Sequence, residues 1–211
     1  MLNRSINRRT FASFIAATSA ALGLSAAHAA SAAVGQAAPA FSAVDALGKS
    51  HKLADFKGRH VVLEWTNPGC PFVVKHYSGN MQALQQEFTA KGVVWLSINS
   101  TAQDAADYLP PAKLMAWKAE KKGTATAMLM DDTGKVGQLY GAKTTPHMYI
   151  INPQGVLIYA GAIDSVPSAR VDDIKTATNY IRQGLTQALA GKPITTATTQ
   201  AYGCSVKYKA A

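Results

Sequence analysis

Two cysteines, Cys70 and Cys204, carry the most obvious chemistry in this sequence. Cys70 follows an apolar run and a Pro68-Gly69 turn and directly precedes Pro71, which places it where a strand gives way to a helix. At a helix N-terminus, unpaired backbone N–H groups and the helix dipole favour a thiolate over a thiol. Val73 stands where a Cys-x-x-Cys motif has its second sulfur. Cys70 is therefore predicted to be a monothiol nucleophile whose only cysteine partner within the chain is Cys204.

The same two cysteines also fit a structural disulfide, a common use of paired cysteines in exported proteins. The protein would then be a non-catalytic binding or scaffold domain held by a Cys70–Cys204 bond. A structural disulfide would not explain why Cys70 lies at a strand-to-helix junction. A thiol-dependent oxidoreductase is the main hypothesis, and the scaffold is the alternative.

Residues 1–29 have the pattern of a cleaved signal peptide. The paired Arg8-Arg9 precedes an apolar stretch over Phe11–Leu24, and Ala27-His28-Ala29 forms a small-x-small cleavage site. The paired arginines are followed by Thr and Phe, as in a twin-arginine signal. The apolar stretch is short and rich in Ala, Ser and Thr, which argues against a membrane anchor. We expect a periplasmic or secreted protein that begins near Ala30 and is not stably inserted in a membrane.

Charge and length limit the class of the mature protein. The formal charge of +9 includes three arginines of the predicted signal, so the mature chain carries about +6. Its basic residues are mostly scattered lysines without interleaved aromatic residues, so no nucleic-acid binding is predicted. Removal of the signal leaves about 180 residues, enough for one domain with its own core.

The segments around Cys70 predict a β-α-β unit. The unbroken apolar run over His60–Trp65 is typical of a parallel strand covered on both faces. A helix is expected over Pro71–Ala90 and a second strand over Val93–Asn99, and such crossovers are nearly always right-handed. The residues at helical spacing in the expected helix are Val74, Tyr77, Met81, Leu84, Gln85 and Phe88.

The rest of the chain predicts an α/β sandwich with a central mixed sheet flanked by helices. Residues 30–190 form the expected domain, and residues 191–211 form a tail that carries Cys204. The expected elements are a strand over Phe41–Val44, a turn over 45–49, a helix over Pro110–Lys122, a strand over Ala127–Met130, a helix over Lys135–Tyr140, a hairpin of His147–Ile151 with Val156–Ala160, and a helix over Val171–Ala190.

Several short motifs occur in a recognisable order: Val34-Gly35, Ala38-Pro39-Ala40-Phe41, Gly48-Lys49, Leu53 to Gly58, the strand into Cys70, and Thr145-Pro146. This order resembles the thioredoxin superfamily, specifically its redoxin and peroxiredoxin-like branch. Cys70-Pro71-Phe72-Val73, together with Gly203 to Tyr208, is most similar to a peroxiredoxin-like subgroup. The resemblance implies a thioredoxin-like sandwich.

The resemblance also implies roles for three residues. Cys70 matches the attacking cysteine of the thioredoxin motif. Thr145-Pro146 matches the cis-proline segment, which would lie opposite Cys70, and the Thr145 backbone would pair with an incoming peptide or ligand. The alternative for Thr145-Pro146 is an ordinary turn into a strand. Cys204 is the distal candidate for a resolving thiol.

Three positions depart from related patterns. Val73 removes the local resolving cysteine of thioredoxins. Asn67 and Leu63 stand where typical peroxiredoxins have Thr or Ser and Pro. Val74 replaces the second cysteine of copper-chaperone relatives, so neither a metal nor another cofactor is predicted.

The expected mechanism begins with attack of the Cys70 thiolate on a disulfide or a peroxide, which gives a mixed disulfide or a sulfenic acid. Cys204 then closes a Cys70–Cys204 disulfide, and an external thiol reductant reopens it. The tail from Gly191 to Cys204 can extend about 40 Å, which allows this meeting. The sequence does not decide between a peroxide and a protein disulfide as substrate.

Three further polar residues lie near Cys70 in the sequence. Lys75 and His76 are expected on an exposed helix face, and the alternative is a cation that lowers the pKa of the thiol. Glu64 is either a buried proton carrier or the exposed end of its strand.

Overall fold

The computed structural model describes residues 1–2 and 32–209. Apart from its first two residues, the predicted signal peptide lies outside the described residues. Within them, the elements are β1 (Ser42–Asp45), β2 (Ser50–Lys52), η1 (Leu53–Phe56), β3 (Val61–Trp65), α1 (Pro71–His76), α2 (Asn80–Ala90), β4 (Val94–Asn99), α3 (Pro111–Glu120), β5 (Ala127–Met130), α4 (Lys135–Tyr140), β6 (Thr144–Thr145), β7 (His147–Ile151), β8 (Leu157–Gly161), η2 (Val171–Lys175), α5 (Tyr180–Leu189) and β9 (Cys204–Ser205).

A mixed seven-stranded sheet, in the order β2-β1-β5-β4-β3-β7-β8, forms the centre of the described structure. Strands β3, β4 and β5 are parallel, whereas β7 runs antiparallel to β3 and pairs with β8 as the predicted hairpin. All five residues of β3 are buried, as expected of a parallel strand covered on both faces. The sheet and its flanking helices confirm the predicted α/β sandwich.

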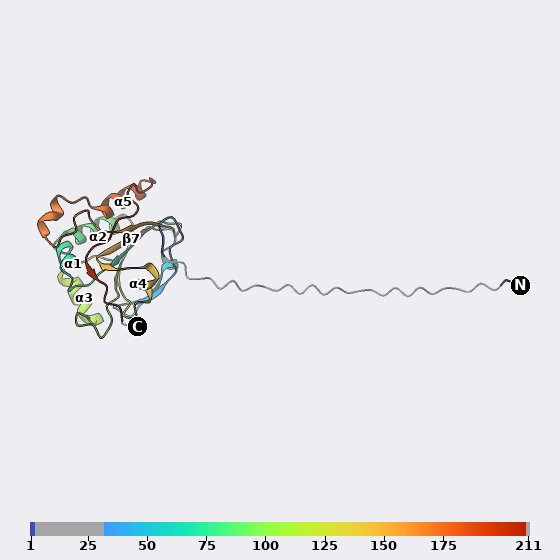
Figure 1. Cartoon of the computed structure of the whole chain (residues 1–211), viewed down its shortest axis with the longest axis horizontal. Coiled ribbons are helices and arrows are strands. Elements are labelled where there is room, and N and C mark those ends of the chain that lie inside the picture. Colours follow the sequence, from blue (N-terminus) through green and yellow to red (C-terminus); the bar gives the residue numbers. More distant parts are fainter. Residues whose placement is uncertain (3–31, 210–211) are drawn as a thin grey trace.

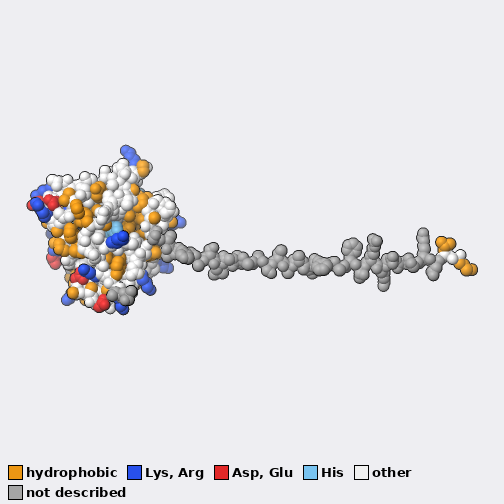
Figure 2. All heavy atoms as spheres, in the orientation of Figure 1, with side chains coloured by type: hydrophobic (Ala, Val, Ile, Leu, Met, Phe, Trp, Pro, Cys, Tyr) orange, Lys and Arg blue, Asp and Glu red, His pale blue; other side chains and the backbone are white. Residues whose placement is uncertain are grey.

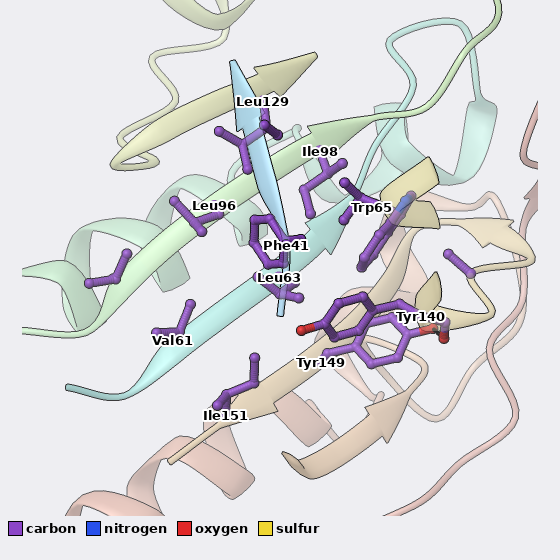
Figure 3. Packing of buried hydrophobic residues seen from close by; sticks show 14 of the residues in the cluster. Phe41, Val61, Leu63, Trp65, Leu96, Ile98, Leu129, Tyr140, Tyr149 and Ile151 are labelled. Carbon is purple, nitrogen blue, oxygen red and sulfur yellow. Dashed lines mark hydrogen bonds between the residues drawn. The ribbon is translucent and has the colours of Figure 1, made fainter. Parts of the chain in front are cut away.

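The two faces of the sheet bury different side chains. Val61, Leu63 and Trp65 of β3 point to the face covered by α4, where the Trp65 ring packs against those of Tyr140 and Tyr149 (Figure 3). The opposite face packs against α1, α2 and α5, which lie together on one side of the molecule (Figure 1). Cys70 belongs to this second cluster. Because side chains alternate between the two faces of β3, the cluster around Trp65 and the cluster that contains Cys70 lie on opposite faces of the sheet.

Two helices predicted as continuous are each broken. The predicted helix over Pro71–Ala90 divides into α1 and α2, because Gly79 adopts a φ of 137°, which no helix residue has. The predicted helix over Val171–Ala190 divides into η2 and α5. Asn179 begins α5, since its side chain accepts a hydrogen bond from the backbone N–H of Arg182 at 2.9 Å. The short strand β2, which pairs with β1, was not predicted.

The tail after α5 packs closely onto the domain. Thr199 lies along β8, where its hydroxyl is 2.7 Å from that of Tyr159. Strand β9, the red arrow in Figure 1, then pairs with β6. Beyond it, the Tyr208 hydroxyl donates to the Ala142 carbonyl at 2.7 Å, and its ring lies so near Gly134 that a Cβ there would be 2.6 Å away. Hydrogen bonds and the close packing of the Tyr208 ring thus hold the tail on the domain without a disulfide.

Surface composition and helix length add two observations. On the face shown in Figure 2, lysine and arginine side chains are scattered among apolar and uncharged ones. Within the described residues, no helix combines the length and apolar character that crossing a bilayer requires.

Candidate active site

Cys70 is the N-cap residue of α1, as the sequence predicts, and only 2% of its surface is exposed. The loop before it is held by Asn67. The Asn67 carbonyl accepts from the Cys70 amide at 3.0 Å, and its side-chain oxygen accepts from the Gly69 amide at 2.8 Å. The Asn67 side-chain amide donates in turn to a carboxylate oxygen of Asp107 at 2.8 Å. These bonds fix the backbone that carries the thiol.

The other cysteine meets Cys70 at the short sheet of β6 and β9. Thr145 pairs directly with Cys204 in that antiparallel register, and the Cys70 thiol donates to the Thr145 carbonyl oxygen at 2.9 Å. Each of the two thiols affects the pKa of the other, and both are free thiols. The two cysteines, 134 positions apart in the chain, therefore share one site.

A glycine makes this close pairing feasible. Gly203 has a φ of 136°, a backbone conformation that L-residues with side chains rarely adopt. A Cβ at this position would collide with the carbonyl oxygen of Thr145. The backbone of β9 can therefore approach Thr145 only with glycine at position 203.

The two thiols have opposite pKa shifts. Burial raises the pKa of Cys70, but the neighbouring side chains of Cys204 and Thr145 and the backbone N–H groups of Val73 and Cys204 outweigh it, so the net pKa is lowered. Burial and the neighbouring Cys70 raise the pKa of Cys204 to about 12, although Lys207 acts in the opposite direction. Cys70 is thus the more acidic of the two thiols, and Cys204 keeps its proton.

The Thr145-Pro146 peptide bond is cis, as expected. Thr145 is 3% exposed, and its hydroxyl has no hydrogen-bond partner among the described residues. Its backbone, which the sequence predicts to pair with an incoming ligand, pairs here with the protein's own tail. The roles of Thr145 and Pro146 in substrate binding stay predictions.

The expectation that Lys75 and His76 are exposed is wrong. They are 1% and 0% exposed, respectively, whereas Val74, expected on the apolar face, is 47% exposed. The Lys75 ammonium lies 3.2 Å from an Asp164 carboxylate oxygen and donates to the Val166 carbonyl at 3.0 Å. A buried ammonium is tolerated when a carboxylate and a carbonyl satisfy it. The helix therefore turns its charged residues inward.

Glu64 is fully buried, so its interpretation as an exposed strand end is wrong. Burial raises the pKa of its carboxyl group, and four side chains donate to its two oxygens at 2.7–3.1 Å. These donors are Tyr77, Gln85, Trp95 and Ser97. They account for the burial of Glu64 as a structural group, and a proton-carrying role stays a prediction.

Sequence reasoning missed Asp164, Tyr202 and Asp107. Asp164 and Tyr202 contact α1, and Asp107 raises the pKa of Cys204. The only local signal was the position of Tyr202 two residues before Cys204. In the part of the chain that the structure describes, no three His, Cys, Asp or Glu side chains form a group that would bind a metal ion.

Comparison of this chain with known proteins indicates the family to which it belongs. A model of the AhpC/TSA family matches residues 34–160. No curated protein matches the chain. A hypothetical protein from Sinorhizobium meliloti is 23% identical with a TM-score of 0.73, over 86% of this chain and 98% of that one. An uncharacterized conserved protein from Geobacillus kaustophilus is 26% identical with a TM-score of 0.71, over 85% of this chain and 94% of that one.

A third structure, the thioredoxin domain of a thiol-disulfide oxidoreductase from Bacteroides vulgatus, is 23% identical with a TM-score of 0.50. That match covers 69% of this chain and 98% of the other. The central sheet, the placement of Cys70 and the structural matches agree on a thioredoxin-like fold. Because the family model spans more than half of the sequence, the chain belongs to the AhpC/TSA family, in the redoxin branch of the thioredoxin superfamily.

Proposed function

We propose that this protein is an exported thiol-dependent oxidoreductase in which Cys70 is the nucleophile and Cys204 the resolving thiol. The observation that carries the proposal is the β6–β9 register, which pairs Cys204 with Thr145, the residue whose carbonyl oxygen lies 2.9 Å from the Cys70 sulfur. The two thiols have opposite pKa shifts. Membership of the AhpC/TSA family supports a redox function of this class.

The first step is a two-electron oxidation of Cys70. Its thiolate attacks an oxygen of a hydroperoxide, so that an S–O bond forms and the O–O bond breaks. The departing alkoxide or hydroxide takes a proton and leaves as an alcohol or water, and Cys70 becomes a sulfenic acid. With a disulfide as oxidant, an S–S bond forms instead, and one thiolate leaves.

The second step uses Cys204, whose raised pKa depends in part on the negative charge at Cys70. Oxidation of Cys70 removes that charge, which lowers the pKa of Cys204 and allows its proton to pass to the departing hydroxide. The Cys204 sulfur then attacks the Cys70 sulfur, and the hydroxide of the sulfenic acid leaves as water after protonation. Two thiols of an external reductant restore both cysteines and are themselves oxidised to a disulfide.

The covering of Cys70 favours a small oxidant over a protein disulfide. Strand β9 occupies the Thr145 backbone, where the sequence predicts that an extended peptide would pair. Cys70 is also nearly inaccessible, whereas Cys204 is more exposed. A hydroperoxide can therefore reach Cys70 more easily than a protein can.

The test is a timed trap of the reduced protein after addition of sub-stoichiometric hydrogen peroxide, with alkylation and peptide mass spectrometry. We expect loss of the Cys70 thiol within seconds and then a linked Cys70–Cys204 peptide. Cys204→Ser is the matched control and should accumulate a Cys70 sulfenic acid. If both thiols of the wild type oxidise no faster than free cysteine, peroxidase activity is excluded. A disulfide that forms once and resists thiol reductants would instead support the scaffold alternative.

Export is the part of the proposal that rests on sequence alone. The support is the basic start, the apolar stretch and the Ala27-His28-Ala29 site. Protein recovered from an envelope or culture fraction should have an N-terminus near Ala30. Recovery of the intact 211-residue chain only from the cell interior would contradict it.

A further inference from the structure

Beneath the active-site helix lies a buried polar cluster that the proposed chemistry does not use, composed of Lys75, His76, Asp164 and Tyr202. Lys75 and His76 end α1, and Asp164 follows β8. Tyr202 belongs to the tail and lies two residues before Cys204. The first three residues are at most 2% exposed. The cluster therefore joins the helix that begins at Cys70 to the tail that carries Cys204.

The hydrogen bonds of this cluster have a defined direction. Asn80 donates its side-chain N–H to Nδ1 of His76 at 2.8 Å, because its oxygen already accepts from Asn179 at 3.1 Å. Nε2 of His76 therefore carries the proton and donates to the Tyr202 hydroxyl at 3.2 Å. Tyr202 donates in turn to Asp164. The tyrosine hydroxyl is both an acceptor and a donor within the cluster.

Contacts around the Tyr202 ring add to these bonds. The ring packs edge-on against Phe72, two residues after Cys70, with centroids 5.8 Å apart. The Lys75 ammonium lies 5.6 Å from the ring centroid. Both the hydroxyl and the ring of Tyr202 thus contact α1, through side chains that lie on one face of that helix.

A buried ion pair of this kind is a weak source of stability, because desolvation offsets much of its attraction. Apolar side chains of similar size would fill this space about as well. Directional bonds do what apolar packing does not: they fix one position of the tail relative to α1. Such precision matters because two cysteines form a disulfide only when their Cα atoms lie within about 7 Å of each other.

We propose that Tyr202 is a positioning residue for disulfide closure, anchored by Lys75, His76 and Asp164 so that Cys204 stays in reach of Cys70. This inference rests on the proposed function and assigns the geometry of its second step. The Tyr202 hydroxyl governs how fast Cys204 attacks oxidised Cys70, and it has no part in the attack of Cys70 on the oxidant.

The test compares wild type with Tyr202→Phe, which keeps the ring on Phe72 and removes only the hydroxyl. Tyr180→Phe is the matched control, because the Tyr180 hydroxyl makes no side-chain hydrogen bond to the described part of the chain. Stopped-flow mixing with hydrogen peroxide, followed by quenching with a dimedone-type sulfenic acid trap or an alkylating agent, resolves the two steps. Thermal unfolding of each variant is measured in parallel.

In Tyr202→Phe, disulfide closure should slow by about tenfold, the factor that corresponds to loss of one hydrogen bond to a charged group. The trapped sulfenic acid should rise accordingly, while loss of the Cys70 thiol keeps its wild-type rate. Tyr180→Phe should match wild type in both steps. His76→Gln, which leaves the buried Lys75–Asp164 pair intact and keeps a side-chain donor for the Tyr202 hydroxyl, should slow closure by less and serves if Tyr202→Phe does not fold.

Equal closure rates in wild type and Tyr202→Phe would overturn the positioning role and leave the proposed function intact. Equal slowing of both steps would also overturn it, because that pattern indicates a general loss of structure. Absence of any Cys70–Cys204 disulfide in the wild type would instead refute the proposed function itself.

Discussion

The pKa values of Cys70 and Cys204 are shifted in opposite directions, and this difference supports the proposed roles of nucleophile and resolving thiol. The surroundings of Cys70 lower its pKa and make it the more acidic thiol, whereas those of Cys204 raise its pKa. The N-cap position predicted part of this asymmetry, through the Val73 N–H. The larger contributions come from Cys204 and Thr145, which only the folded chain brings to the sulfur.

Thr145 provides the sharpest prediction for a single side chain. Thr145→Val keeps the shape of the residue but removes the hydroxyl that lowers the pKa of Cys70. The pH profile of Cys70 alkylation should therefore shift to higher pH, and reaction with peroxide at neutral pH should slow. Thr144→Val is the control, since the Thr144 hydroxyl donates to the Pro146 carbonyl at 3.1 Å instead. Identical alkylation profiles for wild type and Thr145→Val would contradict a role for this hydroxyl.

Among the structural elements, β9 decides whether the two thiols meet. In Gly203→Ala the new Cβ collides with the Thr145 carbonyl oxygen, so β9 must move away from β6. We expect slower disulfide closure and faster reaction of Cys70 with a bulky disulfide reagent, because the cover over the thiol is loosened. Gly191→Ala is a matched control, since Gly191 also has a positive φ (70°) but has open space around its Cα. If both variants behave alike, backbone strain rather than the β6–β9 contact controls closure.

The sequence predicts those elements best whose signal is local. The apolar runs of β3, β4 and β5 fix the parallel core of the sheet, because few other structures bury such runs. The division between α1 and α2 was missed, since helical spacing continues through Gly79 and only its backbone conformation reveals the break. Burial of Lys75 was missed for a different reason: its partners Asp164 and Tyr202 lie 89 and 127 positions away. Long-range partners of this kind leave no periodic pattern.

At the scale of the whole molecule, the buried cluster connects α1, α2, α5 and the tail. Asn179 begins α5 and bonds to Asn80 at the start of α2, which bonds in turn to His76 at the end of α1. The same chain of bonds ends at Tyr202 and Asp164. A change of charge at His76 should therefore affect the stability of the complete fold.

Acid should reveal this dependence. Burial lowers the pKa of His76 to about 4, partly opposed by Asp164 and reinforced by Lys75, from an ordinary value of 6.5. Because the folded pKa is depressed, its contribution to stability is present above pH 6.5 and is lost as pH falls toward 4. Between pH 7 and pH 5, wild type should lose about 2 kcal/mol of unfolding free energy more than His76→Gln, which does not titrate.

Urea unfolding of wild type and His76→Gln at both pH values measures that difference. The comparison cancels groups common to both proteins, including His147, whose pKa burial also lowers to about 4, and Glu64, whose raised pKa acts in the opposite direction. Equal losses in the two proteins would mean that His76 accepts a proton in the folded state as easily as in the unfolded one. The directed bond from its Nε2 to Tyr202 would then not be maintained in solution, and the anchor of the tail would have to rest on Lys75 and Asp164 alone.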